Sequence, residues 1–306
     1  MRIANLAGRA ALTDGTRYVD IHETSDGRFV PDPMDVYERW EEFNAWGPTV
    51  DLSGGRTPTG GELGAPVPRP RQVFAIGLNY KDHADEASLP YPEHLFVFTK
   101  FASCLAGPDV DVELPTGGEV DYETELVVTI GREVHGADEA EALAAVAGYS
   151  VGQDYSERTT QLRPPVPQFS LGKSFPNFGP FGPAVVTPDE LDDPARLRVT
   201  AVLEGPGTEG RGEGGWRVQD GSTADMIFPV ARIIAELSAI TTLFPGDIIF
   251  TGTPAGVGKA HGISLQPGNV LTSTIEGIGT MRNEFVAAAD SAGSTRNGRT
   301  PARTSA

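Results

Sequence analysis

The chain has 306 residues, of which 39% are hydrophobic, so it can bury one large core or one core with a small appendage. Its net charge of −18 argues against nucleic acid as a partner, and an anionic substrate would need cations placed locally around it. A single cysteine, Cys104, excludes an internal disulfide framework. Together with short apolar runs and an N-terminus without a secretory pattern, it predicts a cytoplasmic protein that does not cross a membrane.

Residues 1–67 are expected to form a small N-terminal module of short strands and one helix. The pattern predicts strands at 3–12 and 18–21, joined by a turn at Asp14-Gly15. One amphipathic helix is predicted at 35–46, because apolar side chains return there at the helical period, namely Val36, Trp40 and Phe43.

The main domain is expected at 68–287, after a linker rich in glycine and proline at 52–71. Its predicted elements are, in chain order, a strand at 73–76, a strand at 120–131, a helix at 137–148, a helix that begins at Pro229, and a strand at 247–250 that enters the glycine-rich turn 251–258. The last residues, 288–306, are small and polar and are expected to form a disordered tail. These elements predict a mainly β fold with helices, in the α+β class.

The strand at 120–131 carries two carboxylates that should point the same way. Side chains alternate along a strand with a period of two, so Glu123 and Glu125 share a face. The core-facing side is filled by the alternate residues Tyr122, Thr124, Leu126, Val128 and Ile130. Two like charges on a half-buried strand repel each other and are costly to desolvate, and a bound cation would remove both costs. The alternative is that the pair lines an ordinary solvated face.

A third carboxylate, Asp154, follows the helix predicted at 137–148. That helix is long enough to return the chain beside the same strand. Three carboxylates form a hard oxygen site that suits Mg²⁺ or Mn²⁺, with positions kept for water or substrate. A structural zinc is not expected, because neither cysteine nor a suitably spaced histidine pair is available. As the alternative, Asp154 closes a turn or caps a helix.

His83 and Glu86 follow the strand at 73–76 and are three residues apart. They therefore share a face of a single helical turn. A carboxylate beside an imidazole raises its basicity and fixes its tautomer, which prepares the imidazole to take a proton from water. Surface pairs of histidine and glutamate at this spacing are also common, and they carry no function.

Cations in this acidic chain are candidates for binding a substrate anion. Lys100 and Lys173 are each flanked by apolar residues, which predicts that both are half-buried. Arg158 adds a guanidinium, and Gln161 adds a neutral donor. Each cation could pair a substrate carboxylate or a developing oxyanion. Ion pairs with some of the 42 acidic residues are the alternative for any one of them.

The order and spacing of these pieces resemble the fumarylacetoacetate hydrolase family. The matching motifs include His83, Glu86, Asp154 and Ser156 and the segments 76–80, 98–100, 121–126, 147–149, 172–175, 179–183, 219–223, 226–228, 245–247, 251–258 and 267–268. They run in register from about residue 70 to 286. The resemblance implies a mixed β-sandwich or roll with peripheral helices, usually assembled as a homodimer. The short N-terminal module points to the smaller, bacterial-type branch.

The resemblance also implies roles for individual residues. Glu123, Glu125 and Asp154 would hold a divalent metal, Mg²⁺ or Mn²⁺, that chelates the carboxylate and 2-oxo group of a pyruvate-like substrate. His83 with Glu86, on a lid, would supply the general base, and Lys173 would stabilise negative charge. The positions that match substrate contacts in relatives are Arg158, Gln161 and Thr253.

We therefore expect a metal-dependent hydrolase that cleaves a C–C bond in a 2,4-dioxo acid of the acylpyruvate type. Its products would be pyruvate and a carboxylic acid. The same site would also serve an oxaloacetate decarboxylase or a 2-hydroxyhepta-2,4-diene-1,7-dioate isomerase, and a protein that binds metal and 2-oxo acids without turnover is the alternative from another class. Departures from the family pattern border the expected pocket and leave the acyl group open; they are Gln153, 156–161, 163–168 and 174–178.

Overall fold

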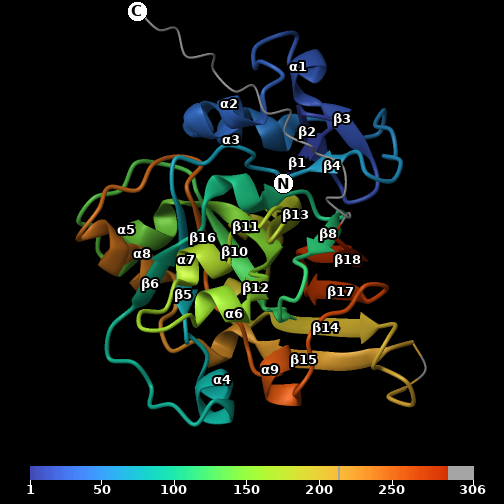
Figure 1. The fold of residues 1–306 in the computed structure, drawn as a ribbon. Helices are drawn as coiled ribbons and strands as arrows, with labels where there is room; N and C mark the ends of the chain where they lie inside the picture. The colour runs from blue at the N-terminus through green and yellow to red at the C-terminus, as the bar shows by residue number, and fades with distance from the viewer. Residues whose placement is uncertain (213, 289–306) are drawn as a thin grey trace, which may run out of the picture.

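The computed structural model describes residues 1–212 and 214–288, in which two β-sheets pack against each other with helices around them (Figure 1). The fold is therefore the mixed α+β type that the sequence predicts. Within the described residues, no helix combines the length and the apolar character needed to cross a membrane. The expected tail at 288–306 lies outside the described residues, apart from Ala288.

The larger sheet has eleven strands within the described chain. Its order is β3 (Tyr18–Asp20), β2 (Arg9–Thr13), β1 (Arg2–Leu6), β13 (Gly179–Val186), β11 (Val146–Gln153), β10 (Thr124–Ile130), β16 (Ile248–Phe250), β5 (Val73–Gly77) and β6 (Phe96–Thr99), with β4 (Leu63–Gly64) on β1 and β7 (Leu105–Ala106) on β13. The smaller sheet has the order β15 (Trp216–Ser222), β14 (Arg198–Glu204), β17 (Val270–Ile275), β18 (Gly279–Ala287) and β8 (Asp111–Leu114). The short strands β9 (Val120–Asp121) and β12 (Ser156–Glu157) pair with each other.

Helices cover the sheets in three groups. Around the N-terminal strands lie α1 (Ile21–Thr24), α2 (Pro33–Glu38) and α3 (Trp40–Trp46). A second group consists of α5 (Glu139–Ala144) and α8 (Val230–Ser238), which pack on each other. The third group consists of α4 (Lys81–Glu86), α6 (Arg158–Gln161), α7 (Phe169–Gly172) and α9 (Gly258–His261), of which α4 and α9 lie at the end opposite the N-terminal strands in Figure 1. Short 3₁₀ turns are η1 (Gly47–Thr49), η2 (Ala102–Cys104), η3 (Pro188–Glu190), η4 (Pro194–Arg196) and η5 (Thr223–Asp225).

The central strand β10 is buried on both faces. Leu126, Val128 and Ile130 face a core shared with α8 and the smaller sheet. Val127, on the opposite face, packs in a second core that includes side chains of the N-terminal strands and helices. The sequence-based description of this strand as half-buried is therefore wrong. Any charge on it is enclosed by protein and needs a compensating group.

Residues 1–67 are hydrogen-bonded into the larger sheet. β1 runs antiparallel to β13, with Arg2 opposite Val186. The expected linker also has structure of its own, because β4 pairs with β1, and Ala65 and Val67 are buried in the second core. The segment predicted as a linker thus contains a strand and buried residues, whereas the division into a module at 1–67 and a domain at 68–287 stays a prediction.

Two N-terminal elements are each divided in the structure. The strand predicted at 3–12 is a hairpin of β1 and β2, turned by Ala7 and Gly8 with φ angles of 52° and 83°. Two residues with positive φ match the twist of a hairpin. Alanine is not typical of such a turn, so the sequence does not predict it. The helix predicted at 35–46 breaks at Arg39, whose φ of −116° and ψ of 34° leave the helical region. Both sequence predictions are wrong in their boundaries.

The helix predicted at 137–148 is shorter than expected. α5 begins after a capping box in which Asp138 and Glu141 exchange hydrogen bonds with the backbone, and it ends at Ala144. The chain then enters β11 at Val146. Because β11 pairs with both β10 and β13, these long-range ladders outweigh the local helical pattern.

The directions of the strands place several chain segments at the same end of the larger sheet. β16 and β5 run parallel, so the turn 251–258 after β16 and the segment before α4 emerge at the same end of this sheet. β10 runs antiparallel to β16, and β11 runs antiparallel to β10. The start of β10 and the end of β11 therefore lie at that end of the sheet too, with Thr124 opposite Gln153.

Candidate active site

Three carboxylates lie close together at this end of the larger sheet. Glu123 lies in the gap between β9 and β10, Glu125 is the second residue of β10, and Asp154 directly follows β11. Each offers one oxygen, these oxygens lie within 4.8 Å of one another, and all three residues are buried. The backbone N–H of Asp154 donates to the carbonyl oxygen of Glu123 at 3.0 Å, which holds the two segments side by side. The structure thus brings together the three residues predicted to hold a metal.

The strand predicted at 120–131 is interrupted at Glu123, so the prediction of one continuous strand is wrong. Two buried glutamine side chains replace ladder partners at the break. Gln153 Oε1 accepts from the N–H of Glu123 at 2.9 Å, and Gln219 Oε1 accepts from the N–H of Thr124 at 3.1 Å. Because Gln153 is fully buried, it supports the main chain of the cluster and does not line a pocket.

Lys173, which follows α7, places its ammonium between two of the carboxylates. Nζ donates to Glu123 Oε2 at 2.8 Å and to Asp154 Oδ2 at 2.7 Å. Burial acts to lower the pKa of Lys173, but Asp154 and Glu123 outweigh it and raise that pKa above its ordinary value. Lys173 is therefore a fixed positive charge in the cluster.

The positive charge is distributed unevenly among the carboxylates. Burial acts to raise the pKa of Glu123, but Lys173 and Arg158 outweigh it and hold that pKa below its ordinary range. Burial raises the pKa of Glu125 well above its ordinary value, and the carboxylates of Asp154 and Glu123 add to the rise. Glu125 is thus the member of the cluster whose negative charge is least compensated.

The donor set fits a hard divalent cation. Closely spaced carboxylate oxygens are the ligands that Mg²⁺ and Mn²⁺ prefer. Glu125 accepts a hydrogen bond from the N–H of Gly252 at 2.8 Å, and among the described residues it has no ion-pair partner. A cation held by Glu123, Glu125 and Asp154 would compensate that buried charge.

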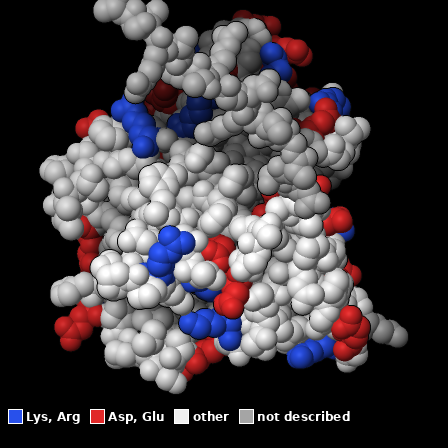
Figure 2. Space-filling model, viewed as in Figure 1, with Lys and Arg blue, Asp and Glu red and all other residues white. Residues whose placement is uncertain are grey.

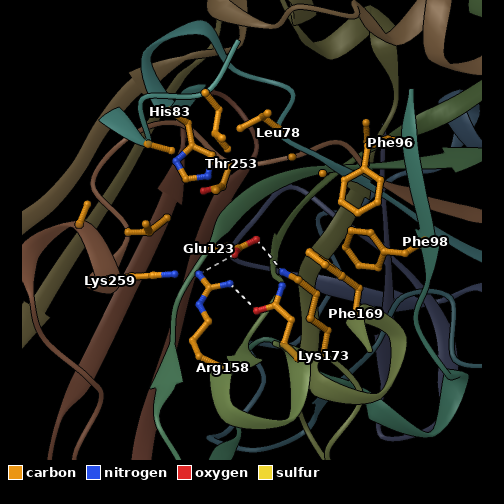
Figure 3. A pocket seen from close by; sticks show the side chains of 18 of the residues that line it. Leu78, His83, Phe96, Phe98, Glu123, Arg158, Phe169, Lys173, Thr253 and Lys259 are labelled. Carbon is orange, nitrogen blue, oxygen red and sulfur yellow. Dashed lines mark hydrogen bonds and ion pairs between the residues drawn. The ribbon is translucent and has the colours of Figure 1, made fainter. Parts of the chain in front are cut away.

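A cavity of about 610 Å³ adjoins the cluster through Glu123 and Lys173, which both line it. Other predicted site residues in its lining are His83, Glu86, Arg158, Gln161 and Thr253. Its apolar lining includes Leu78, Leu89, Phe96, Phe98, Leu162 and Phe169. Figure 3 shows His83 and Thr253 on one side and Phe96 and Phe98 on the other, with Glu123 between them. The cavity therefore has one polar side and one aromatic side.

His83 and Glu86 face each other on α4 at the cavity. His83 Nδ1 lies 3.5 Å from Glu86 Oε2, and the two side chains are 18% and 25% exposed. The Glu86 carboxylate also accepts from the N–H of Gly256 at 3.0 Å. Asp82 accepts from the N–H of Ala255 at 3.2 Å, so α4 is attached to the glycine-rich turn at two points. The imidazole is therefore presented to the cavity with a carboxylate beside it.

Asn79, between β5 and α4, fixes the start of that helix. Its Nδ2 donates to the carbonyl oxygens of Thr251 at 2.7 Å and Phe228 at 3.1 Å, and its Oδ1 accepts from the N–H of Phe228 at 2.8 Å. Asn79 is fully buried, so water does not compete for these bonds. The position of His83 is thus set by the core of the molecule.

Arg158 links the cluster to a further acid, Asp121. Its Nη2 donates to Glu123 Oε1 at 2.8 Å and to Asp121 Oδ2 at 2.6 Å, and its Nη1 donates to Gln161 Oε1 at 2.8 Å. Burial acts to lower the pKa of Arg158, but Glu123 and Asp121 outweigh it and raise that pKa. Thr253 Oγ1 accepts from Gln219 and donates to the backbone of β10 at 2.9 Å.

Lys100 is predicted to contact substrate, but it does not line the cavity. Its side chain has 0% exposure, and Nζ donates to Asp154 Oδ1 at 2.6 Å. The same ammonium donates to the carbonyl oxygens of Lys173 and Phe178. All three of its protons are used within the protein, so this geometry assigns Lys100 to holding Asp154.

Sequence reasoning missed two residues at the site, Asp121 and Lys259. The Asp121 carboxylate accepts from Arg158 and also from the N–H of Gly258 at 2.6 Å, which ties α9 to the cluster. Lys259 lines the cavity. The available signals were an acid two residues before Glu123 and a cation directly after a glycine-rich turn.

Comparisons with known proteins identify relatives of this chain. The sequence model described as "Fumarylacetoacetate (FAA) hydrolase C-terminal" matches residues 72–286. Oxaloacetate tautomerase FAHD2A, a mitochondrial protein of Homo sapiens, is 40% identical over 225 residues, which cover 72% of this chain and 68% of that protein.

Solved structures give the same result. An HpcE-like protein from Mycobacterium smegmatis has a TM-score of 0.87 and 47% identity, over 94% of this chain and 100% of that one. The maleylpyruvate hydrolase of Sphingobium sp. SYK-6, solved in complex with manganese(II) and pyruvate, has a TM-score of 0.73 and 28% identity, over 94% and 100% of the two chains. On the site geometry and on these matches, the chain belongs to the fumarylacetoacetate hydrolase family.

Proposed function

We propose that this protein is a divalent-metal-dependent hydrolase that cleaves the C3–C4 bond of a 2,4-dioxo acid. The observation that carries the proposal is that one cavity holds His83, with Glu86 beside it, together with Glu123 and Lys173 of the carboxylate cluster (Figure 3). A proton acceptor and a charged centre that stabilises an enolate therefore face the same space. These are the two functions that hydrolysis of an acylpyruvate needs.

The proposed cofactor is Mg²⁺ or Mn²⁺, held by Glu123, Glu125 and Asp154. The maleylpyruvate hydrolase relative, solved with manganese(II) and pyruvate, supports this choice. When bound, such a cation supplies Lewis acidity toward the carboxylate and 2-oxo group of a pyruvoyl substrate. In this proposal Lys100 positions Asp154.

The chain's own residues carry the proton movements. His83 Nε2 takes a proton from water, with Glu86 next to Nδ1 stabilising the imidazolium, and the resulting hydroxide adds to the C4 carbonyl. When the C3–C4 bond breaks, its electron pair forms the enolate of pyruvate, and the Lys173 ammonium stabilises the negative charge on that enolate. His83 returns the proton to C3. One water is consumed, and pyruvate and a carboxylic acid leave.

A second candidate is a proton shift without C–C cleavage. The similarity to a human oxaloacetate tautomerase favours it, because tautomerisation needs the same base and the same stabilised enolate. The cavity of about 610 Å³ is roomy for a four-carbon acid, which favours a substrate longer than oxaloacetate.

Product analysis separates the two candidates. The purified protein with Mg²⁺ or Mn²⁺ is given acetylpyruvate, fumarylpyruvate and oxaloacetate, and pyruvate release and enol–keto exchange are both followed. We expect pyruvate from an acylpyruvate, and exchange on oxaloacetate with no cleavage of any substrate would overturn the hydrolase. His83→Ala should lower kcat for hydrolysis by about 10²–10⁴-fold. His94→Ala, at an exposed residue outside the cavity, is the matched control.

We also propose that the protein assembles as a homodimer. β6 is an edge strand of the larger sheet, and apolar side chains on and beside it are exposed, including Phe96, Val97 and Phe101. Such a surface is costly to leave in water. Light scattering in solution measures the mass, and a monomer at micromolar concentration would contradict this assembly.

A further inference from the structure

One wall of the cavity is formed by three phenylalanine side chains, Phe96, Phe98 and Phe169. Their rings contact one another. The centroid of the Phe169 ring lies 5.0 Å from that of Phe96, with the two rings at 87°, and 5.6 Å from that of Phe98. Aromatic pairs prefer such edge-to-face or tilted arrangements, which hold the rings in place. The three rings form a continuous apolar surface, named here the aromatic wall.

The sheet fixes the aromatic wall at the cavity. Side chains alternate along a strand, so Phe96 and Phe98 of β6 face the cavity, whereas Val97 between them points the other way and does not line it. β6 pairs with β5, and Gly77 lies opposite Phe96. A Cβ at Gly77 would clash with the Phe96 ring, so the missing side chain makes room for that ring. The backbone of β5 therefore supports the wall from behind.

The aromatic wall adjoins the charged cluster. The Lys173 ammonium lies 5.3 Å from the centroid of the Phe98 ring, and the same ammonium donates to Glu123 and Asp154. Figure 3 shows Phe96 and Phe98 across the cavity from His83. A substrate with its pyruvoyl end at the cluster would therefore place its acyl group between the imidazole and this wall.

The cavity exposes apolar surface that a ligand could cover. Phe96 is 42% exposed although it lines the cavity, and Leu89 and Leu162 in the same lining are 49% and 44% exposed. Apolar surface left in water is costly, and an apolar ligand that covers it removes that cost. Leu78 also lines the cavity, with a φ of 53° that glycine would adopt more easily. A leucine kept in this conformation points to a use for its apolar atoms there.

The cations that line the cavity, within the part of the chain that the structure describes, are already paired or solvated. Lys173 and Arg158 are ion-paired to carboxylates of the site. Lys259 is exposed, so water solvates its ammonium. Figure 2 shows basic and acidic side chains side by side in the lower centre of this face. A carboxylate on the acyl group would therefore lose hydration against the aromatic wall without gaining a buried partner.

We infer that the acyl group of the substrate is uncharged and apolar, and that Phe96, Phe98 and Phe169 select it. This inference rests on the proposed hydrolysis and names the class of its substrate, a 2,4-dioxo acid with an aliphatic or aromatic acyl group of several carbons. Such a group buries the exposed ring surface when it binds. A short acyl group leaves most of that surface in water, and a charged one must be desolvated to cover it.

Two substrates of the same shape test the inference. 4-Methylpentanoylpyruvate and succinylpyruvate differ only at the end of the acyl chain, where an isopropyl group in the first replaces the carboxylate of the second. We expect kcat/KM of the wild type with Mn²⁺ to be at least about tenfold higher for 4-methylpentanoylpyruvate. Phe96→Ala should lower that value by about tenfold, mainly through KM. The same variant should change kcat/KM for acetylpyruvate by less than about twofold, because a methyl group covers little of the wall.

Phe96→Lys should reverse the preference, because it replaces apolar surface with a cation near the acyl chain. Val97→Ala is the matched control, since Val97 lies on the same strand with its side chain away from the cavity. Val97 also belongs to the exposed surface of the proposed dimer, so an equal loss in Val97→Ala and Phe96→Ala would assign the effect to assembly and overturn the role of the wall. Affinity for Mn²⁺ and the far-ultraviolet spectrum should be the same in all variants.

The remaining outcomes separate this inference from the proposed function. If the wild type cleaves succinylpyruvate as well as 4-methylpentanoylpyruvate or better, the apolar acyl site is wrong while the hydrolase stands. The same holds if Phe96→Ala affects these two substrates alike. If the wild type cleaves neither of them, nor acetylpyruvate, with Mg²⁺ or Mn²⁺, the proposed function itself fails.

Discussion

Gly256 donates its backbone N–H to the two carboxylate oxygens of Glu86, at 3.0 Å and 3.1 Å. Four residues earlier in the same turn, the N–H of Gly252 donates to Glu125 at 2.8 Å. One glycine-rich turn therefore holds both the helix that carries the proposed base and a carboxylate of the proposed metal site. Two main-chain N–H groups four residues apart therefore fix the proposed base and the proposed metal site relative to each other.

Gly256→Ala should destabilise the protein and lower its activity. Gly256 has a φ of 100°, and a Cβ there would lie 2.0 Å from the carbonyl oxygen of Val218, so the turn must move. We expect the free energy of unfolding to fall by more than about 2 kcal/mol, as measured in denaturant, with kcat reduced at saturating metal. Gly54→Ala is the control, because a Cβ at Gly54 has open space and its φ is not positive. Equal stability of the two variants would contradict this role of the turn.

Glu123→Gln should remove the metal site. Losing a carboxylate from a three-carboxylate set should weaken Mn²⁺ binding by at least about a hundredfold, measured by calorimetry. A chelator should lower the melting temperature of the metal-loaded wild type, because a ligand at 100 times its Kd stabilises the fold by about 2.7 kcal/mol. The same chelator should leave Glu123→Gln unchanged. Glu113→Gln, at an exposed position of β8, should behave as wild type.

Metal affinity should increase with pH. Burial raises the pKa of Glu125 well above its ordinary value, with Asp154 and Glu123 adding to the rise. Below that raised pKa the metal-free protein holds Glu125 as the neutral acid, so binding Mn²⁺ must release a proton. Affinity should then increase about tenfold per pH unit and level off above the raised pKa.

The raised pKa of Glu125 also predicts that the metal-free protein becomes less stable as pH rises. A raised carboxyl pKa contributes stability that is fully present below the pKa of the unfolded state and is lost as pH rises through the pKa of the folded state.

The pH dependence of metal affinity is checked by calorimetry in two buffers of different ionisation enthalpy, which counts the protons released when Mn²⁺ binds. Glu125→Gln, which has no proton to release, should bind weakly and without this pH dependence. A wild-type affinity that does not vary with pH would show that Glu125 is already ionised.

Lys100→Met should cost stability rather than substrate affinity. The substitution leaves Asp154 buried with one of its two lysine partners, and removing one member of a buried ion pair costs about 3–5 kcal/mol. With metal saturating, KM for the substrate should remain within about twofold of the wild-type value, because Lys100 does not line the cavity. Lys81→Met, at an exposed lysine, is the stability control. A large increase in KM with normal stability would restore Lys100 to substrate contact.

Much of the site could be predicted because its parts lie in short, patterned segments. Glu125 lies on an apolar strand, and His83 and Glu86 have the spacing of one helical turn. Asp154 was found because the element before it returns the chain, although that element is a shorter helix followed by β11. Period and spacing are local properties, so the sequence displays them directly.

What could not be predicted depends on contacts between distant segments. The break at Glu123 is stabilised by amide groups of Gln153 and Gln219, which lie far along the chain. The apolar flanks of Lys100 predicted a half-buried side chain, but the side chain is fully buried, and only the fold shows that Asp154 and two carbonyl groups use all its protons. Lys259 is a single residue without a pattern, and only its place in the cavity lining reveals it.

The attachment of α4 relies on carboxylates that bind backbone N–H groups. Asp82 and Glu86 contact the N–H groups of Ala255 and Gly256, and an N–H is present at position 255 whatever side chain stands there, proline excepted. Side chains elsewhere on the cavity wall can therefore be exchanged without shifting the imidazole. If the proposed function holds, substitutions at the wall alone could therefore give the same scaffold a different acyl preference, with His83 and Glu86 left in place.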